Sequence, residues 1–485
     1  MYTTHTYQDW LATPETERPE LALEIVRSYK SSAEFKHALT AAEYFRSDNA
    51  AIKSKMLMKP VAVTYKDEKG RTRRSSKAQE IAGNQIGSSY LFRFVAQRSQ
   101  HLLSNGVTLD DEAQKARLGL EFDNVLQQVA ERALYQGVSY AFWNVDHAEP
   151  LYVAVDAFSG FVALLDESTS APMVGLQFWQ LSEKRPLYIR VYDESGVTLY
   201  RKAKDALQVV QERRPYKQVT RTDALGVEVI GGDNYSGRVP IIPLYADDDA
   251  QGMFTPALRA KIDAYDRILS DFGDNLDRAN DVYWVLNNFG GTTDDIVTML
   301  EQINKIKAVA NLSDGTGNNS TAEPRTIDVP YEARRVALDL LERAMYKDAM
   351  ALDMQSITGG SLTNVAIKAA ARDLNLACDR LEWQCRKFVL ALLQLIGAKV
   401  DSVRFKRAEL ANDTETIESI YMFREDITRE YALRLNPMVD EADIPDLLAA
   451  KAVEDETGVP DEDALAAKMK EAVEDEPGDG DPEAV

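Results

Sequence analysis

A heptad of apolar residues in the last quarter of the chain is the feature that most restricts its possible folds. Between Ala366 and Ile396 the apolar positions step alternately by four and three residues, at Leu374, Cys378, Leu381, Cys385, Phe388, Leu392 and Leu395. This spacing puts them on one face of a helix about 46 Å long. The pattern fits a long helix in the chain's own core or a coiled-coil seam, and we favour the core helix.

Other segments alternate between helical and strand patterns. Apolar residues at three- and four-residue steps predict helices over 14–58, 77–103, 110–136, 256–280, 331–353 and 412–450. Residues 59–74 are expected to form a strand and a loop. Alternating residues and Gly- or Asn-containing turns between Val138 and Tyr245 predict several antiparallel strands, and Val400–Phe405 predicts another. The fold class is therefore α+β and mainly helical.

A small insert separates two of these helices. Strands are expected at Val282–Leu286, Ile306–Leu312 and Arg325–Val329, with a short helix at Asp294–Ile303. The helix before the insert carries one apolar stripe, and its other faces carry several aspartates and arginines. An insert of this kind lies at the end of a helical hairpin.

Composition and charge narrow the class of protein. The chain has 485 residues, of which 45% are hydrophobic, enough for a large core and two or more sub-domains. Its net charge is −22, and residues 436–485 hold 17 acidic and 3 basic side chains. The tail from 451 onward is therefore expected to be disordered. A mildly acidic body is poor support for tight binding of DNA phosphates, although DNA could slide past it.

Targeting and redox signals point to the cytosol. The N-terminus has no basic region followed by an apolar stretch, and no apolar run approaches the roughly 18 to 20 residues of a membrane span. The only cysteines, Cys378 and Cys385, are two helical turns and about 10 Å apart, which is too far for a disulfide.

Catalytic and metal-binding motifs are missing from the sequence. It contains no phosphate-binding Gly-x-x-x-x-Gly-Lys motif, no His-Glu-x-x-His pair and no Gly-x-Ser-x-Gly elbow. Its four histidines lack metal-site spacing, so no cofactor and no metal are expected. Asp247-Asp248-Asp249 begins like a calcium loop, but Leu258 stands where the bidentate Glu should be, and a solvated turn is favoured over weak cation binding.

Several local stretches together resemble the portal proteins of siphovirus-type tailed phages, over roughly residues 35–440. The resemblance rests on Ala42–Ile52, Ala133–Tyr140, Ile357–Lys368 and, most of all, the pair Arg238–Tyr245 and Ile262–Asp271. The chain departs from the family at Thr363–Val365, where a glycine is expected.

The resemblance implies a portal fold whose regions can be placed on this sequence. These regions are an α/β wing at 1–255, a stem helix at 256–281, a clip at 282–330, a second stem helix at 331–353, a tunnel loop at 354–365, the long wing helix and a return strand at 366–410, a helical crown at 411–450 and the acidic tail at 451–485.

The same resemblance implies a non-enzymatic role and a set of partners. It implies a ring, with twelve subunits expected, at one capsid vertex of the virion, assembled in the host cytoplasm and serving DNA packaging, retention, ejection and tail attachment. The implied partners are double-stranded DNA, terminase, the major capsid and scaffolding proteins and a head–tail adaptor, with no membrane. A DNA-processing enzyme or a helical scaffold protein remains the alternative, and a stable assembly of about twelve subunits would favour the portal.

Candidate site residues fall into two groups. The uncharged, mostly small residues of the loop could contact DNA phosphates without trapping them, with Lys368 one turn beyond: Gln355, Ser356, Thr358, Gly359, Gly360, Ser361, Thr363 and Asn364. A plain connector is the competing interpretation. Charged residues of the first stem helix are expected to line the channel and repel DNA: Asp263, Asp271 and Asp274, with Arg278.

Overall fold

Two compact units make up the computed structural model of this chain. The first comprises Met1–Asp353 and Asp373–Ala408, and the second Met354–Arg372 and Glu409–Val485. The structure describes residues 5–53, 55–66, 72–204, 206–223, 226–235, 237–279, 283–287, 321–325, 331–354, 364–408, 413–423, 426–436, 438–439 and 443–457.

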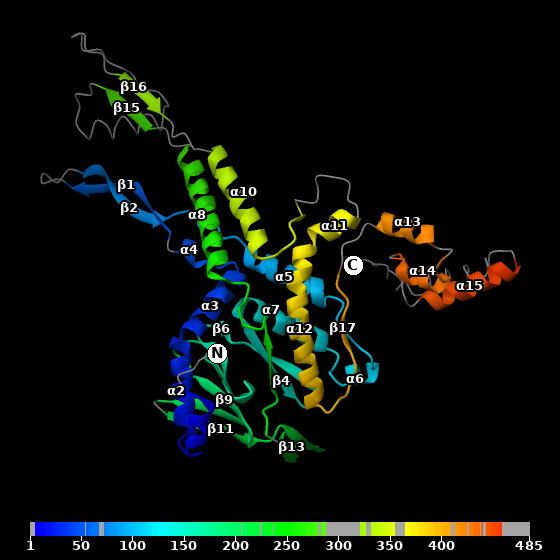
Figure 1. Cartoon of the computed structure of the whole chain (residues 1–485). Coiled ribbons are helices and arrows are strands. Elements are labelled where there is room, and N and C mark those ends of the chain that lie inside the picture. Colours follow the sequence, from blue (N-terminus) through cyan, green and yellow to red (C-terminus); the bar gives the residue numbers. More distant parts are fainter. Residues whose placement is uncertain are drawn as a thin grey trace, which may run out of the picture. The chain divides into compact units, whose positions relative to one another are not determined.

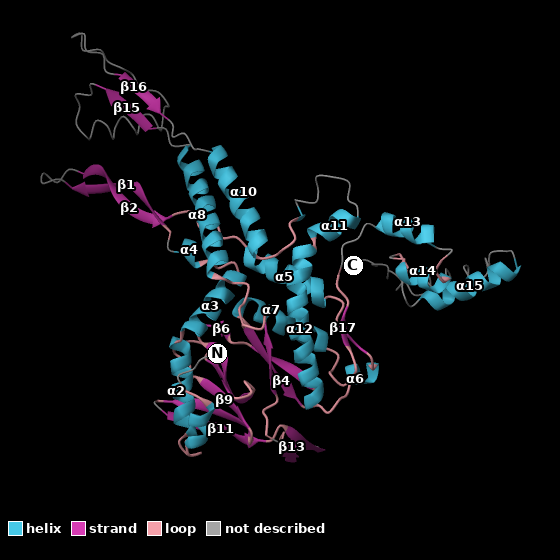
Figure 2. Ribbon diagram, viewed as in Figure 1, coloured by secondary structure: helices cyan, strands magenta, loops and turns pink. Residues whose placement is uncertain are grey.

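The first unit is built around antiparallel sheets, as the alternating sequence predicts (Figure 2). A six-stranded sheet has the order β11-β10-β9-β8-β7-β6, with a three-stranded sheet β14-β4-β5 in the same unit. The bounds are β4 Val138–Asn144, β5 His147–Leu151, β6 Ala154–Asp156, β7 Ser159–Leu165, β8 Pro172–Trp179, β9 Tyr188–Asp193, β10 Gly196–Ala203, β11 Ala206–Arg214 and β14 Ile241–Tyr245. A separate hairpin pairs β12 (Lys217–Asp223) with β13 (Gly226–Asp233).

Helices α2 (Arg18–Ser31) and α3 (Ala33–Phe45) pack on the six-stranded sheet and close its core (Figure 1). The short helix α1 (Tyr7–Ala12) contributes Trp10 to the same core. Aromatic rings meet where helix and sheet join, with Tyr29 and Phe178 centroids 6.4 Å apart. The predicted helical stretch 14–58 is divided into several helices. Ser32 interrupts it as the N-cap of α3, and α4 (Ala50–Lys53) is the last helix within it.

Two predicted helices were wrong in extent. Residues 77–103 were expected to be helical, yet β2 (Thr72–Ala82) pairs with β1 (Met56–Lys66), and α5 begins only at Tyr90 and ends at Leu103. Pairing with a strand outweighs local helix preference there. Residues 110–136 form two helices, α6 (Glu112–Ala116) and α7 (Phe122–Gln136), because Gly119 between them has φ +89°.

The helices around the insert match the sequence pattern closely. Helix α8 spans Pro256–Ala279 and α10 spans Tyr331–Asp348. Helix α10 ends five residues before the predicted position, because Met350 has φ +50° and the Ala351 N–H turns back to the Tyr346 carbonyl at 3.0 Å. Within the insert, β15 (Tyr283–Asn287) pairs with β16 (Thr321–Arg325). The predicted helix 294–303 and strand 306–312 lie outside the described residues.

The apolar heptad is buried in the chain's own core, which confirms the favoured interpretation. Helix α12 spans Arg372–Leu395, with buried residues Leu374, Cys378, Leu381, Cys385, Phe388 and Leu392. The predicted single helix from 366 is interrupted by a turn at Ala371, before which α11 spans Asn364–Ala370. Strand β17 (Val403–Phe405) pairs with β3 (Val107–Leu109).

The second unit contains the C-terminal helices. The predicted helical stretch 412–450 is divided into α13 (Asp413–Phe423), α14 (Arg429–Leu435) and α15 (Ile444–Thr457), and Thr428 caps α14. Helix α15 continues past the expected start of the tail at 451. Among the described residues of the whole chain, none forms a helix long and apolar enough to cross a bilayer.

Candidate functional site

Helices α8 and α10 form an antiparallel hairpin (Figure 1). At one end, Lys261 near the start of α8 pairs with Asp348 at the end of α10. At the other end, the Phe272 and Tyr331 rings lie 5.8 Å apart, and Arg334 donates to the Asp271 carbonyl at 3.3 Å. Contacts at both ends fix the two helices side by side.

The apolar stripe predicted for α8 is buried only in its first half. Leu258 and Ile262 are each 1% exposed, whereas Leu276 is 50% exposed. The buried face continues instead through Asp266, Ser270 and Asp274, each four residues after the last. One face of α8 thus changes from apolar to polar while staying buried.

This polar face holds the extended segment between β2 and α5. The main-chain N–H groups of Ser88, Ile86 and Asn84 donate to Asp266 Oδ1 at 3.0 Å, Ser270 Oγ at 3.0 Å and Asp274 Oδ1 at 2.8 Å. We call these three contacts the polar ladder. Its register follows from geometry, because four helical residues rise about 6.0 Å and two extended residues span about 6.6 Å.

Two further features of α8 support the polar ladder. Gly273 brings the α8 backbone close to the segment, since a Cβ there would lie 3.1 Å from Asn84 Nδ2. Asn49 donates a second hydrogen bond to the Asp266 carboxylate. Burial raises the pKa of Asp266 despite these donors.

The three predicted channel-lining aspartates have partners within their own chain. Asp263 accepts a hydrogen bond from the Tyr44 hydroxyl and lies 3.8 Å from Arg259 Nε. Asp274 is 4% exposed and lies 2.6 Å from Lys55 Nζ, which is 2.7 Å from the more exposed Asp271.

Arg278 lies in α8, and its side chain is not among those that the structure describes. Within this chain Asp274 is buried, and so is Asp266, which was not among the predicted channel-lining residues. Whether the remaining residues line a channel stays a prediction. The four-residue spacing of Asp266, Ser270 and Asp274 was the sequence feature that could have indicated a buried polar face on this helix.

The segment before the predicted DNA-contacting loop is held by α5. Gln97 forms two hydrogen bonds with Leu352, both 2.9 Å long. The Gln97 Nε2 donates to the Leu352 carbonyl, and the Leu352 main-chain N–H donates to Gln97 Oε1. Arg98 Nη2 donates to the Ala349 carbonyl at 2.6 Å. The loop thus follows a fixed point of the first unit.

Most of the predicted loop site lies outside the described residues, namely Gln355, Ser356, Thr358, Gly359, Gly360, Ser361 and Thr363. Asn364 opens α11 in the second unit, where its N–H donates to Glu415 at 2.6 Å and its Nδ2 to Thr416 at 3.2 Å. Lys368 is exposed on α11. A DNA contact by Lys368 stays a prediction, and the Asn364 amide has partners in α13.

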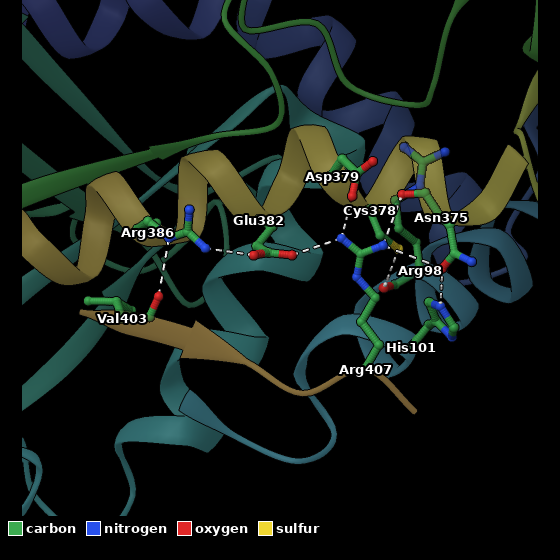
Figure 3. Close-up of polar contacts among 9 residues, drawn as sticks. All are labelled: Arg98, His101, Asn375, Cys378, Asp379, Glu382, Arg386, Val403 and Arg407. Carbon is green, nitrogen blue, oxygen red and sulfur yellow. Dashed lines mark hydrogen bonds and ion pairs between the residues drawn. The ribbon is translucent and has the colours of Figure 1, made fainter. Parts of the chain in front are cut away.

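A network of charges fixes the return segment along α12 (Figure 3). Arg407 pairs with Asp379 and, at 2.8 Å, with Glu382, which also binds Arg386 at 2.7 Å. Arg386 in turn donates to the Val403 carbonyl at 3.2 Å. These contacts clamp β17 and the residues after it onto the outer face of the buried helix.

The acidic loop before α8 has structural partners. Asp247 Oδ1 accepts the N–H groups of Asp249 at 3.1 Å and Gln251 at 2.8 Å. Asp248 binds Gln384 and Lys387 of α12 at 2.7 and 2.9 Å. In the part of the chain that the structure describes, no three His, Cys, Asp or Glu residues are grouped to hold a metal ion.

Comparison with known proteins adds the family context. A protein family described as "Phage portal protein, SPP1 Gp6-like" matches residues 28–457. A curated relative, the portal protein of Clostridium phage phiCD119, is 27% identical over 189 residues. The matched region covers 38% of this chain and 42% of the relative, so the chain spans less than half of that protein's length in the match.

Proposed function

The chain belongs to the SPP1 Gp6-like phage portal protein family, and from this premise we propose that it is one subunit of the ring-shaped channel through which DNA enters and leaves the capsid. The observation that carries the proposal is the family match over residues 28–457. The antiparallel hairpin of α8 and α10, with a small insert at its end, supports it from the structure. The role is structural, which disfavours a DNA-processing enzyme.

Within such a ring, the α8–α10 hairpin would serve as the stem, and the insert 282–330 as the clip. The clip would bind terminase during packaging and a head–tail adaptor afterwards. Residues 354–365 would form the tunnel loop, 366–410 the long wing helix and a return strand, and 411–450 the helical crown. The ring would contain twelve subunits, contact the major capsid and scaffolding proteins, and assemble in the host cytoplasm before it occupies one vertex of the virion.

Ring formation is the first test. Negative-stain microscopy of the purified chain should show closed rings of about twelve subunits. A chain that stays monomeric at the concentrations reached during assembly would argue for the alternative, a helical scaffold protein.

The loop is tested separately. Its small neutral residues would touch DNA phosphates without the salt-dependent grip of a lysine ring. Gly359→Val together with Gly360→Val should leave rings intact yet reduce packaged DNA or let it leak, because valine restricts the backbone. Normal DNA content and infectivity of this variant would contradict a DNA-contacting loop.

The clip is tested by deletion of residues 294–319. Rings should still form, because the stem helices have their own contacts at both ends, but terminase binding should be lost. Unchanged affinity for terminase would remove the clip assignment.

A further inference from the structure

The long hairpin of β1 and β2 lacks a packing partner in its own chain (Figure 1). The two strands have eleven residues each and pair over their whole length, from Met56 opposite Ala82 to Lys66 opposite Thr72. At about 3.3 Å per residue, each strand is about 35 Å long. Neither strand packs along another helix or strand in the part of the chain that the structure describes. We call this hairpin the arm.

The foot of the arm, Lys55 and residues 83–88, is fixed on α8. Lys55 precedes β1 and pairs with Asp271 and Asp274. The polar ladder holds the residues that follow β2, and the Gly83 N–H closes the base by donating to the Lys55 carbonyl at 3.3 Å. Helix α8 therefore anchors the foot firmly, whereas the two strands beyond it are left to pair with each other.

The register divides the residues of the arm between two faces, because cross-strand partners share a face and successive residues alternate. One face has five large apolar or aromatic residues, three basic residues and no acidic residue: Leu57, Val61, Val63, Tyr65 and Ile81, with Lys59, Arg73 and Lys77. A two-stranded hairpin alone in water is marginally stable at best. This face therefore needs a partner that covers it.

Charge indicates the kind of partner. The two strands contain five basic residues and one acidic residue, a net charge of +4 in a chain whose total is −22, so all other residues together carry −26. Opposite charges steer two surfaces toward each other. A second copy of this chain thus attracts the arm, while two arms repel each other. Duplex DNA is also acidic, but its phosphates would leave the apolar residues of the arm uncovered.

A second copy also presents an apolar surface of the right kind. On the stretch of the α8–α10 hairpin that includes the foot, four apolar or aromatic side chains are at least half exposed: Leu276, Tyr331, Val336 and Leu340. They stay exposed although the same chain carries an arm. Rotational symmetry in a ring would bring the same stretch of a neighbouring copy level with the foot of the arm.

We propose that the arm of each subunit packs its apolar face onto the α8–α10 hairpin of the neighbouring copy. The inference rests on the ring proposed above and gives that ring a specific interface. Because the arm and the surface that receives it are different parts of the chain, the contact is head-to-tail and repeats from copy to copy until the ring closes.

Amide hydrogen exchange of the full-length chain, measured in assembled rings and in dissociated protomers, tests the contact. Residues 56–66 and 72–82 should exchange at least tenfold more slowly in rings, because the free hairpin opens readily and the docked one does not. Equal exchange in rings and protomers would overturn the proposal. Slowing that appears only after duplex DNA is added would identify DNA as the partner and would overturn it as well.

Two matched variants of β1 test which face is used. Val61→Glu combined with Val63→Glu should abolish the slowing and raise the protomer concentration needed for ring formation at least tenfold. Ala62→Glu combined with Thr64→Glu adds the same charge to the same strand on the opposite face, and it should behave as the parent does. Equal ring formation by the two variants would overturn the arm contact while the ring itself stands. A parent chain that forms no rings would overturn the proposed function and this inference together.

Discussion

Lys55 is the residue whose replacement should disturb the α8 contacts most. Its side chain is 14% exposed, and its Nζ lies 2.6 Å from Asp274 and 2.7 Å from Asp271. Lys55→Met leaves the buried Asp274 carboxylate next to the Asp271 carboxylate without their shared cation. Removing one partner of a buried ion pair costs about 3 to 5 kcal/mol, and we take about 3, because Asp271 is 56% exposed and solvent screens it.

Amide hydrogen exchange at residues 83–89 measures this effect locally. A loss of about 3 kcal/mol in local opening free energy should speed exchange of the Asn84 amide by about 150-fold. Asp274→Asn should cost only about 1 kcal/mol and speed exchange about fivefold. Its amide oxygen can still accept from Asn84, and Lys55 keeps Asp271.

The double variant gives the decisive comparison. Lys55→Met combined with Asp274→Asn should exchange more slowly than Lys55→Met alone, because the unpaired buried charge is gone. Equal rates in Lys55→Met and the parent would refute the ion pair as a support of this segment. Additive effects of the two changes would refute the coupling between the two side chains.

Three further outcomes follow from the described contacts. Burial raises the pKa of Asp266 above its ordinary 3.8, so the folded chain binds this proton more tightly than the unfolded chain does. The free energy of unfolding therefore falls as the pH rises from 3.8 through the raised pKa. Asp266→Asn should remove this pH dependence in urea unfolding, and an unchanged pH dependence would contradict the argument. Gln97→Ala should speed exchange of the Leu352 amide about tenfold or more, while the exposed Gln100→Ala should not, and equal rates would argue against the two hydrogen bonds. Removing residues 458–485, acidic and poor in apolar residues, should leave the melting temperature nearly unchanged, whereas a large drop would show that this segment packs.

Element type was predictable wherever the apolar period was long and regular. The α12 heptad, the extent of α8 and the start of α10 follow directly from the sequence, because their apolar residues meet the core at helical spacing. The segment 77–89 was misjudged, since its N–H groups bond to β1 and to side chains of α8 that lie about 180 residues away. No local pattern reveals such distant acceptors.

The candidate site was predictable only in outline. The stem aspartates were identified from their charge, which by itself indicates a solvated face. Asp266 and Asp274 are instead buried, because a distant segment supplies donors at matching spacing. The clamp of Gln97 on Leu352 was missed for a similar reason, since its partners are main-chain groups more than 250 residues away.

The polar ladder implies an uneven tolerance to mutation on its two sides. Its donors at 84, 86 and 88 are main-chain groups, which every residue except proline supplies. Its acceptors are three side chains of one helix, where a larger or apolar residue would leave a partly buried N–H without an acceptor. A systematic substitution scan should therefore find positions 84, 86 and 88 permissive apart from proline, and the helix face at 266, 270 and 274 restricted to short side chains that carry an oxygen.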